Sequence, residues 1–237
     1  MGNRKSPDGW VSLDNSAKIY PAVRTRDWAA MFRVSVTLKD EVDQGLLERA
    51  LADTLKRIPA FCLSLHKGVF WFYLEPNRLP SIVEPDVNNP CKKIDKRESN
   101  GYFRVRVYRS RIALELFHSI SDGNGAMVFL KTLAARYLTL SGHPIPAGEG
   151  VLDCAEEPHP EEMEDSHAAY ASFRHIESRR EKKAYHPRMT RMPPPRLRII
   201  TGVMPAGAVH EKAAGLGVTV NEYLTGALCY AFYLLQK

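Results

Sequence analysis

The sequence lacks the long apolar runs and the leader sequence that direct a chain into or across a membrane. No run of its 237 residues approaches the roughly 18 apolar residues of a membrane span. The first residues, Met1 to Lys5, carry charge but are followed by no apolar core, so they do not form a signal peptide. We therefore expect a cytoplasmic protein with no membrane span.

Paired cysteines and metal-ligand patterns are also absent from the sequence. The four cysteines, at positions 62, 91, 154 and 229, are far apart and form no Cys-x-x-Cys pair. This spacing argues against a zinc ribbon or a dithiol redox motif and is typical of a reducing compartment, with four inert thiols. The histidines show no ligand-like spacing with cysteines or acidic residues, so we predict no metal site.

The most informative segment is 117–125, which reads Phe-His-Ser-Ile-Ser-Asp-Gly-Asn-Gly. Residues 111–117 are rich in branched and aromatic side chains and predict a short, largely buried strand. Residues 124–138 carry apolar side chains at helical spacing and predict a helix, with Asn124 as a plausible N-cap. His118 is therefore predicted at the end of a strand, and Asp122 and Gly123 at the turn into a helix.

The residue types in this segment are suited to proton transfer. An imidazole, with an ordinary pKa of about 6.5, can accept and return a proton at neutral pH. Asp122 can turn back towards the loop or pair with a basic side chain, while Gly123 and Gly125 remove bulk beside an approaching ligand. The alternative is an ordinary strand-end histidine followed by an Asp-Gly turn, and the local sequence leaves both interpretations open.

The pattern His118-x-x-x-Asp122-Gly123, between a strand and a helix, resembles the His-x-x-x-Asp-Gly motif of the CoA-dependent acyltransferase superfamily. This group includes chloramphenicol acetyltransferase, the plant BAHD acyltransferases, alcohol acetyltransferases and the condensation domains of peptide synthetases. Further segments resemble its alcohol-acetyltransferase-like members in the expected order, namely residues 10–21, 57–61 and 217–224.

The resemblance implies transfer of an acyl group from acyl-CoA, as co-substrate, to a small alcohol or amine. His118 would be the general base, Asp122 a structural residue held by a basic partner, and Gly123 a residue that leaves room for the substrates. The unranked candidates for the basic partner are Arg24, Arg26 and Arg33. No bound cofactor and no metal is implied, and no residue is identified as binding coenzyme A.

Two other functions stay open. The chain is alternatively a non-catalytic binding or assembly module of the same fold. A third possibility is a condensation-like domain that uses carrier-protein thioesters, which is disfavoured because such domains usually show two adjacent histidines where this chain has Phe117 and His118. Ser119 and Ser121 lie outside a Gly-x-Ser-x-Gly elbow, so neither is predicted to be a nucleophile.

The expected fold is α/β, a chloramphenicol-acetyltransferase-like two-layer sandwich whose mixed sheet has helices on one face. Before the motif we predict strands at 31–38, 61–65, 69–74 and 102–109, an edge strand near 81–83, and a helix at 42–57. Aromatic residues 70–73 are expected in the core, and Trp10, Leu13, Ile19 and Tyr20 are expected to anchor the N-terminal arm.

Three regions are predicted along the chain. Residues 1–150 form an N-terminal half with the motif, 151–195 a charged crossover linker, and 196–237 the beginning of a truncated second half. In the last region we expect a strand at 196–203, a short helix at 208–216 and a buried helix at 221–235. Because this final helix is apolar on nearly every side, self-association or a missing C-terminal half is expected to cover it.

Charge is distributed unevenly, although the net charge is only +6. Acidic residues gather at 153–165 and basic residues at 174–191, just before three prolines at 193–195. The basic cluster is either a surface for the phosphates of coenzyme A or part of a solvated linker whose charges offset each other, and we favour the linker. No nucleic-acid motif is present, so we do not expect nucleic acid as a partner.

Overall fold

The computed structural model describes residues 9–25, 28–77, 83–87, 89–92, 94, 102–164, 183–187 and 199–236. The chain forms two compact units, residues 1–174 and 175–237. The boundaries that the sequence suggests at positions 150 and 195 stay predictions.

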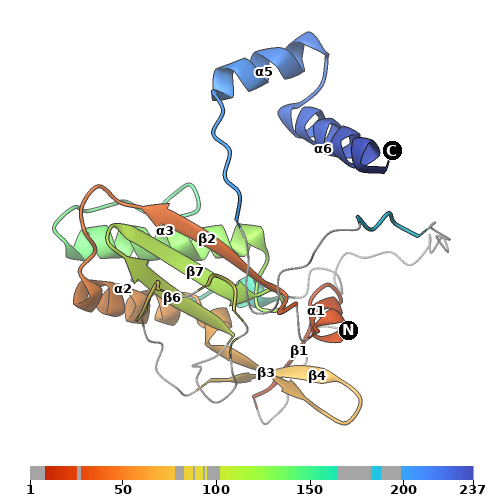
Figure 1. Cartoon of the computed structure of the whole chain (residues 1–237). Helices are drawn as coiled ribbons and strands as arrows, with labels where there is room; N and C mark the ends of the chain where they lie inside the picture. The colour runs from red at the N-terminus through yellow and green to blue at the C-terminus, as the bar shows by residue number, and fades with distance from the viewer. Residues whose placement is uncertain are drawn as a thin grey trace. The chain divides into compact units, whose positions relative to one another are not determined.

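A four-stranded mixed sheet forms the centre of the first unit (Figure 1). Its strands, in spatial order, are β2 (Met31–Thr37), β7 (Arg111–Phe117), β6 (Phe103–Tyr108) and β5 (Val83–Pro85). β7 pairs antiparallel with both β2 and β6, whereas β5 lies parallel to β6 at the edge. The α/β class, the mixed sheet and these four strands are confirmed.

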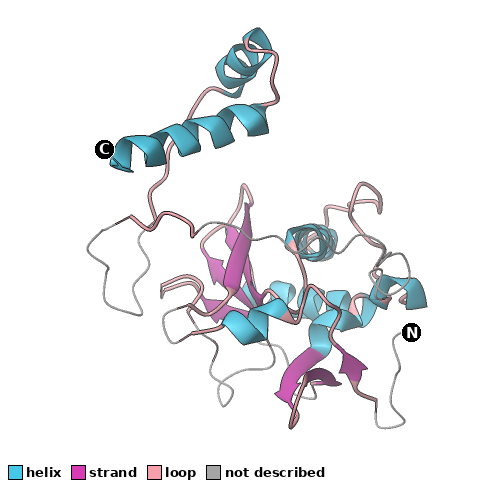
Figure 2. Ribbon diagram, turned by 90° about the vertical axis from the view of Figure 1, so that its right-hand side faces the viewer, coloured by secondary structure: helices cyan, strands magenta, loops and turns pink. Residues whose placement is uncertain are grey.

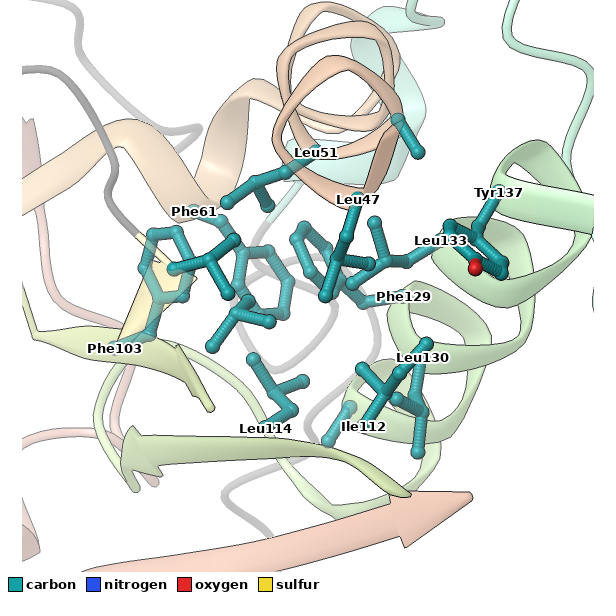
Figure 3. Packing of buried hydrophobic residues seen from close by; sticks show 14 of the residues in the cluster. Leu47, Leu51, Phe61, Phe103, Ile112, Leu114, Phe129, Leu130, Leu133 and Tyr137 are labelled. Carbon is teal, nitrogen blue, oxygen red and sulfur yellow. The ribbon is translucent and has the colours of Figure 1, made fainter. Parts of the chain in front are cut away.

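Two helices, α2 (Gln44–Arg57) and α3 (Gly123–Leu140), pack on one face of this sheet. Figure 3 shows their buried side chains meeting those of β6 and β7. Phe61 is central to this core, because its ring stacks on Phe129 at 4.1 Å and meets Phe103 edge-on at 5.6 Å. Each fully buried side chain of this size contributes roughly 1.5 to 3 kcal/mol to folding. The predicted arrangement of helices on one face is confirmed.

Polar contacts fix the start of α2, two residues after the predicted start at Val42. The carboxylate of Asp43 accepts a hydrogen bond of 2.7 Å from Leu46 N and begins α2. The backbone N–H of the same residue donates to the Tyr137 hydroxyl at 2.9 Å, which links the start of α2 to α3. After α2, Pro59 opens a short 3-10 helix, η1 (Pro59–Cys62), as expected for a proline at a helix end.

The other face of the sheet carries buried charge. Alternation along β7 directs Leu114 and Leu116 to the helices, and therefore Glu115 to the opposite face. The Glu115 carboxylate is fully buried and accepts hydrogen bonds from Arg104 Nε at 2.7 Å and Arg33 Nη1 at 3.1 Å. A second carboxylate, that of Asp86, pairs with Arg33 as well. The carboxylates buried on this face are thus paired with arginines.

A smaller, three-stranded sheet lies beside the first and has the order β1 (Val11–Ser12), β4 (Phe72–Pro76), β3 (Leu63–Lys67). The predicted hairpin is confirmed, and Phe72 packs against a buried cluster as expected, but the core position predicted for Phe70 and Trp71 is wrong. Phe70 is 89% exposed and Trp71 is 55% exposed. Both lie in the turn closed by the hydrogen bond from Gly68 N to Trp71 O, which places them at the exposed tip of the hairpin.

The N-terminal arm packs on the first unit through some of the expected anchors. Leu13 is buried, with Ala17, in a cluster that also contains Phe117 and Tyr102. Ile19 is 58% exposed and is therefore not an anchor, because it lies on the outer side of a five-residue helix, α1 (Ile19–Val23). The acidic segment also contributes to this unit, since the 3-10 helix η2 (Pro160–Met163) carries an acidic side chain that pairs with α2.

The described elements of the second unit are two helices, α5 (Ala206–Gly215) and α6 (Val220–Gln236), coloured cyan in Figure 2. Residues 199–203 are not a strand, which corrects the predicted strand in that part, and residues 196–198 lie outside the described residues. None of the described side chains of α6 is buried, which corrects the predicted buried helix, because the described residues of the second unit leave its apolar side chains exposed. Among the described residues no helix has the length and apolar character needed to cross a bilayer.

Candidate functional site

His118 begins the turn that leaves the sheet after β7. Its backbone N–H donates to the carbonyl of Ala30 at 3.0 Å, so the antiparallel pairing of β2 and β7 continues one residue beyond Met31 and Phe117. The chain then turns, with Ile120 N donating to Phe117 O at 2.9 Å. The sequence predicts this strand-end position, and the structure places His118 there.

Two aromatic rings hold the half-buried imidazole of His118. The ring of Tyr20 stacks on it with centroids 4.1 Å apart and planes only 8° from parallel. Phe32, from β2, lies 4.7 Å away with its ring tilted by 48°. The Tyr20 hydroxyl is also 3.3 Å from His118 Nε2, within hydrogen-bonding distance. The imidazole therefore has a fixed ring plane, and because the two planes are nearly parallel, the hydroxyl lies over the face of the ring and not in its plane.

The next residue, Ser119, is a structural contact rather than an exposed hydroxyl. Its side chain is buried, and its Oγ donates to the carbonyl of Ala17 at 2.8 Å. Ala17 N in turn donates to the Asp14 carboxylate at 2.7 Å, which holds the arm in a turn. The motif loop is thereby fastened to the N-terminal arm.

Asp122 begins helix α3. Its carboxylate accepts a hydrogen bond from Gly125 N at 2.8 Å, and its carbonyl accepts one from Ala126 N at 3.0 Å. The N-cap is therefore Asp122 and not the predicted Asn124, because the helix already starts at Gly123. The side chain is exposed and fixes the geometry of the turn that follows His118.

A basic partner for Asp122 is not found among the ion pairs of the described residues. Arg33, one of the three candidates, is engaged with Asp86 and Glu115 on the far face of the sheet. Arg24 lies with its guanidinium carbon 5.3 Å from the centre of the Phe117 ring. The third candidate, Arg26, lies outside the described residues.

The two glycines of the motif differ in their surroundings. A Cβ atom added at Gly123 would meet nothing within 4 Å, so the space beside this residue is open. A Cβ atom at Gly125 would collide with the Ser121 hydroxyl. Neither residue has a positive φ, so Gly125 is needed here for space and not for backbone angle, whereas neither reason applies at Gly123.

Two cavities lie near the motif, and the described residues that line them do not include His118. One of about 160 Å³ is bordered by the motif loop at Ser119 and Ile120 and by the arm at Leu13 and Ala17. The other is an apolar groove of about 630 Å³ that runs between β2 and α3. Within the described part of the chain, no cluster of three His, Cys, Asp or Glu side chains is arranged to hold a metal ion.

Sequence reasoning missed Tyr20 as a site residue and assigned it only to packing of the arm. Tyr20 lies 98 positions before His118. No spacing rule connects positions so far apart, and Phe32 is one of several apolar residues in a strand. The sequence gives one signal: Tyr20 lies in the N-terminal arm and Phe32 in the predicted strand 31–38, and both segments are expected near the motif.

No family model matches this sequence, and no curated protein matches it. Among solved structures, it is similar to a variant of the starter condensation domain of rhizomide synthetase in complex with C8-CoA and Leu-SNAC, with 10% identity, a TM-score of 0.48, and coverage of 58% of this chain and 37% of that one. It is also similar to SgcC5 protein from Streptomyces globisporus, with 16% identity, a TM-score of 0.46, and coverage of 61% and 40%.

A third similar structure is polyketide synthase associated protein 5 from Mycobacterium tuberculosis, with 18% identity, a TM-score of 0.43, and coverage of 57% of this chain and 35% of that one. The chain thus spans 35% to 40% of the length of these three structures.

Proposed function

We propose that this chain carries an acyl-transfer site in which His118 is the general base. The observation that carries the proposal is the position of His118, which is half-buried at the end of β7, directly before the turn into α3, and held in its ring plane by Tyr20 and Phe32. A histidine fixed in one orientation is suited to act as a general base.

The proposed reaction proceeds in two steps. His118 Nε2 removes the proton from an alcohol or amine as the acceptor oxygen or nitrogen attacks the carbonyl carbon of an acyl-CoA thioester. The tetrahedral intermediate then collapses, the carbon–sulfur bond breaks, and the thiolate of coenzyme A takes the proton back from the imidazolium. No acyl-enzyme forms, and the histidine ends in its starting state.

The other two motif residues have supporting roles in this proposal. Asp122 holds the first turn of α3 through its hydrogen bond to Gly125 N, which fixes the chain directly after His118. Gly123 leaves open space beside the turn, since a Cβ there would meet no atom within 4 Å. We propose that this space belongs to the route by which the substrates reach the histidine.

A second candidate function is a non-catalytic binding or assembly module. It is favoured by α6, where Leu228, Tyr230 and Leu235 are each more than half exposed. Exposed apolar surface of this kind is typical of an interaction site. A domain that takes its acyl group from a carrier protein is the third alternative.

The test is release of free thiol from acetyl-CoA and C8-CoA in the presence of a panel of alcohols and amines. We compare the unchanged chain with His118→Ala and with a matched control, His143→Ala, whose residue is exposed and distant in sequence from the motif. Loss of a general base lowers the rate by about 100-fold or more. The control should retain full activity.

Four outcomes separate the candidates. Thiol release that disappears only in His118→Ala supports the acyltransferase. Release that is equal in all three proteins contradicts His118 as the base. No release from free acyl-CoA, together with acyl transfer from a phosphopantetheinyl carrier protein, supports the condensation-like alternative, and no transfer from either donor leaves the binding module.

A further inference from the structure

The turn that joins β3 and β4, residues 68–71, presents three consecutive apolar side chains to solvent (Figure 1). Val69 is 80% exposed and Phe70 is 89% exposed, and Trp71 is more than half exposed. Leu65 and Leu74, in the strands behind the turn, are buried. The exposed apolar surface of this hairpin is therefore concentrated in its turn.

The β3–β4 turn has a defined shape. The hydrogen bond from Gly68 N to Trp71 O, at 2.7 Å, closes it directly after the last residue pair of the two strands. A Cβ atom added at Gly68 would lie 3.4 to 3.5 Å from the Trp71 ring, so this ring is folded against the turn. Val69 and Phe70 are the side chains that remain facing outwards.

Aromatic rings with polar atoms lie directly behind the two outermost side chains. Besides the indole of Trp71, the phenol ring of Tyr73 stacks on His66, with centroids 5.6 Å apart. The Trp10 ring meets Tyr73 edge-on at 6.0 Å. Tryptophan and tyrosine are the residues that gather where lipid headgroups meet acyl chains, because one end of each side chain is apolar and the other is polar.

Charge near the β3–β4 turn is positive. Lys67 is exposed and has no ion-pair partner among the described residues. The two strands contain one acidic residue, Glu75, which pairs with Ser64, three residue pairs behind Lys67 and Phe72. At the rise of a strand this is a distance of about 10 Å. Apolar groups therefore come first, then aromatic rings and a lysine, and a carboxylate last.

We propose that the β3–β4 turn docks on an anionic lipid bilayer, with Val69, Phe70 and Trp71 in the interface and Lys67 at the headgroups. The order of groups along the hairpin is that of a bilayer surface, whose acyl chains lie beneath negative headgroups. Interfacial segments enter by about 5 to 10 Å, which this hairpin can do before Glu75 reaches the headgroups. A net charge of +6 favours a negative surface, and a projecting turn needs no matching pocket in lipid. This binding site goes beyond the proposed acyl transfer and does not depend on it.

Contacts at the base of the hairpin join it to the rest of the first unit. The Tyr102 hydroxyl donates to Leu65 O at 3.1 Å, and Tyr102 O accepts from Phe117 N at 2.7 Å. Leu65 is two residues before Lys67 in β3. Docking of the turn therefore holds the strand that ends at the motif, and not the hairpin alone.

The first test is flotation of the full chain with vesicles of phosphatidylcholine and phosphatidylglycerol, or of phosphatidylcholine alone, since flotation separates bound from aggregated protein. We expect binding to the anionic vesicles. Phe70→Ser should lower it by about tenfold or more, and Lys67→Gln by about fivefold, both with unchanged thermal midpoints. Leu228→Ser, at an exposed apolar position of α6, is the matched control and should bind as the unchanged chain does.

The second test places the contact at the β3–β4 turn. The sequence has three tryptophans, so Trp10→Phe with Trp28→Phe leaves Trp71 as the sole one. We expect its fluorescence to be quenched when the vesicles contain lipids with nitroxide-labelled acyl chains, because such quenching acts only at close range.

Four results would overturn the proposal. They are absence of binding to anionic vesicles, equal binding to neutral vesicles, binding without quenching of Trp71, and binding that is lost in Leu228→Ser but kept in Phe70→Ser. If the turn binds a second copy instead, the unchanged chain will form an oligomer that Phe70→Ser dissociates, and it will not float with the vesicles. None of these measurements uses an acyl donor, so they are independent of the thiol-release assay.

Discussion

Arg57 and Glu162 form a two-bonded ion pair that joins the end of α2 to η2. Arg57 Nη1 donates to Glu162 Oε2 and Nη2 donates to Oε1, each at 2.7 Å. The arginine side chain is only 2% exposed, whereas the glutamate is 34% exposed. The parallel geometry is the strongest form of arginine–carboxylate contact, so an acidic residue in the predicted linker helps to hold the first unit together.

Removing the charge of Glu162 should therefore destabilise the chain. Glu162→Gln leaves the buried guanidinium of Arg57 without its counter-ion, and we expect a loss of about 1 to 3 kcal/mol in the free energy of unfolding. The measurement is urea denaturation at neutral pH. Glu161→Gln, in the same 3-10 helix but exposed, is the control and should change stability by less than about 0.5 kcal/mol. Equal effects of the two substitutions would contradict a specific role for the pair.

Stability should fall in acid because of Asp86. Burial tends to raise the pKa of this carboxyl, but hydrogen bonds from Arg33 and Arg111 outweigh it and hold the pKa below its ordinary value. A carboxyl with a lowered folded-state pKa stabilises the fold above its ordinary pKa, and that contribution is lost as the pH falls through the lowered value. We expect the urea concentration at the unfolding midpoint to decrease as the pH is lowered below about 4. The decrease should be shallower in Asp86→Asn.

The role of Asp122 can be tested by comparing two substitutions. Asp122→Ala removes the N-cap of α3 and should cost about 1 kcal/mol, whereas Asp122→Asn keeps an oxygen that accepts from Gly125 N and should cost much less. Thermal unfolding of both variants gives the answer. If a basic partner outside the described residues held the carboxylate, the asparagine variant would be as unstable as the alanine variant.

The two glycines of the motif should respond differently to alanine. Gly125→Ala brings a methyl group against the Ser121 hydroxyl and should lower the thermal midpoint, and the added change Ser121→Ala should restore most of the loss. Gly123→Ala meets open space in the first turn of a helix, so its stability should be unchanged or higher by up to about 1 kcal/mol. A loss at Gly123 as large as that at Gly125 would show that the open space is filled in solution.

Much of the fold of the first unit is predictable because its signals are local. The alternation in 31–37 and the helical spacing in 44–57 and 123–140 determine which faces are apolar, and each element lies within a few residues of its predicted range. Phe70 and Trp71 are predicted in the core because aromatic residues in strands usually pack inside. Their exposure depends on where the turn ends, since β4 begins at Phe72, three residues later than the predicted strand.

The candidate site is predictable only at the motif. His118 and the turn at Asp122 follow from the change from strand to helix, which is visible within fifteen residues of sequence. Tyr20 is brought to His118 by the register of β2 against β7 and by the bond between Ser119 and Ala17, and both are properties of the folded chain. A partner for Asp122 cannot be named from the sequence for the same reason, because three arginines are equally plausible near the expected strand.

The bond from His118 N to Ala30 O makes the histidine's own amide a reporter of the N-terminal segment. An amide proton in such a bond exchanges with solvent only when the bond opens. Deuterium uptake at this one position therefore measures how often the segment that carries Tyr20 detaches from the motif, and it does so without substrate or substitution. If detachment of the arm precedes acceptor binding, protection of this amide will decrease when the acceptor is added.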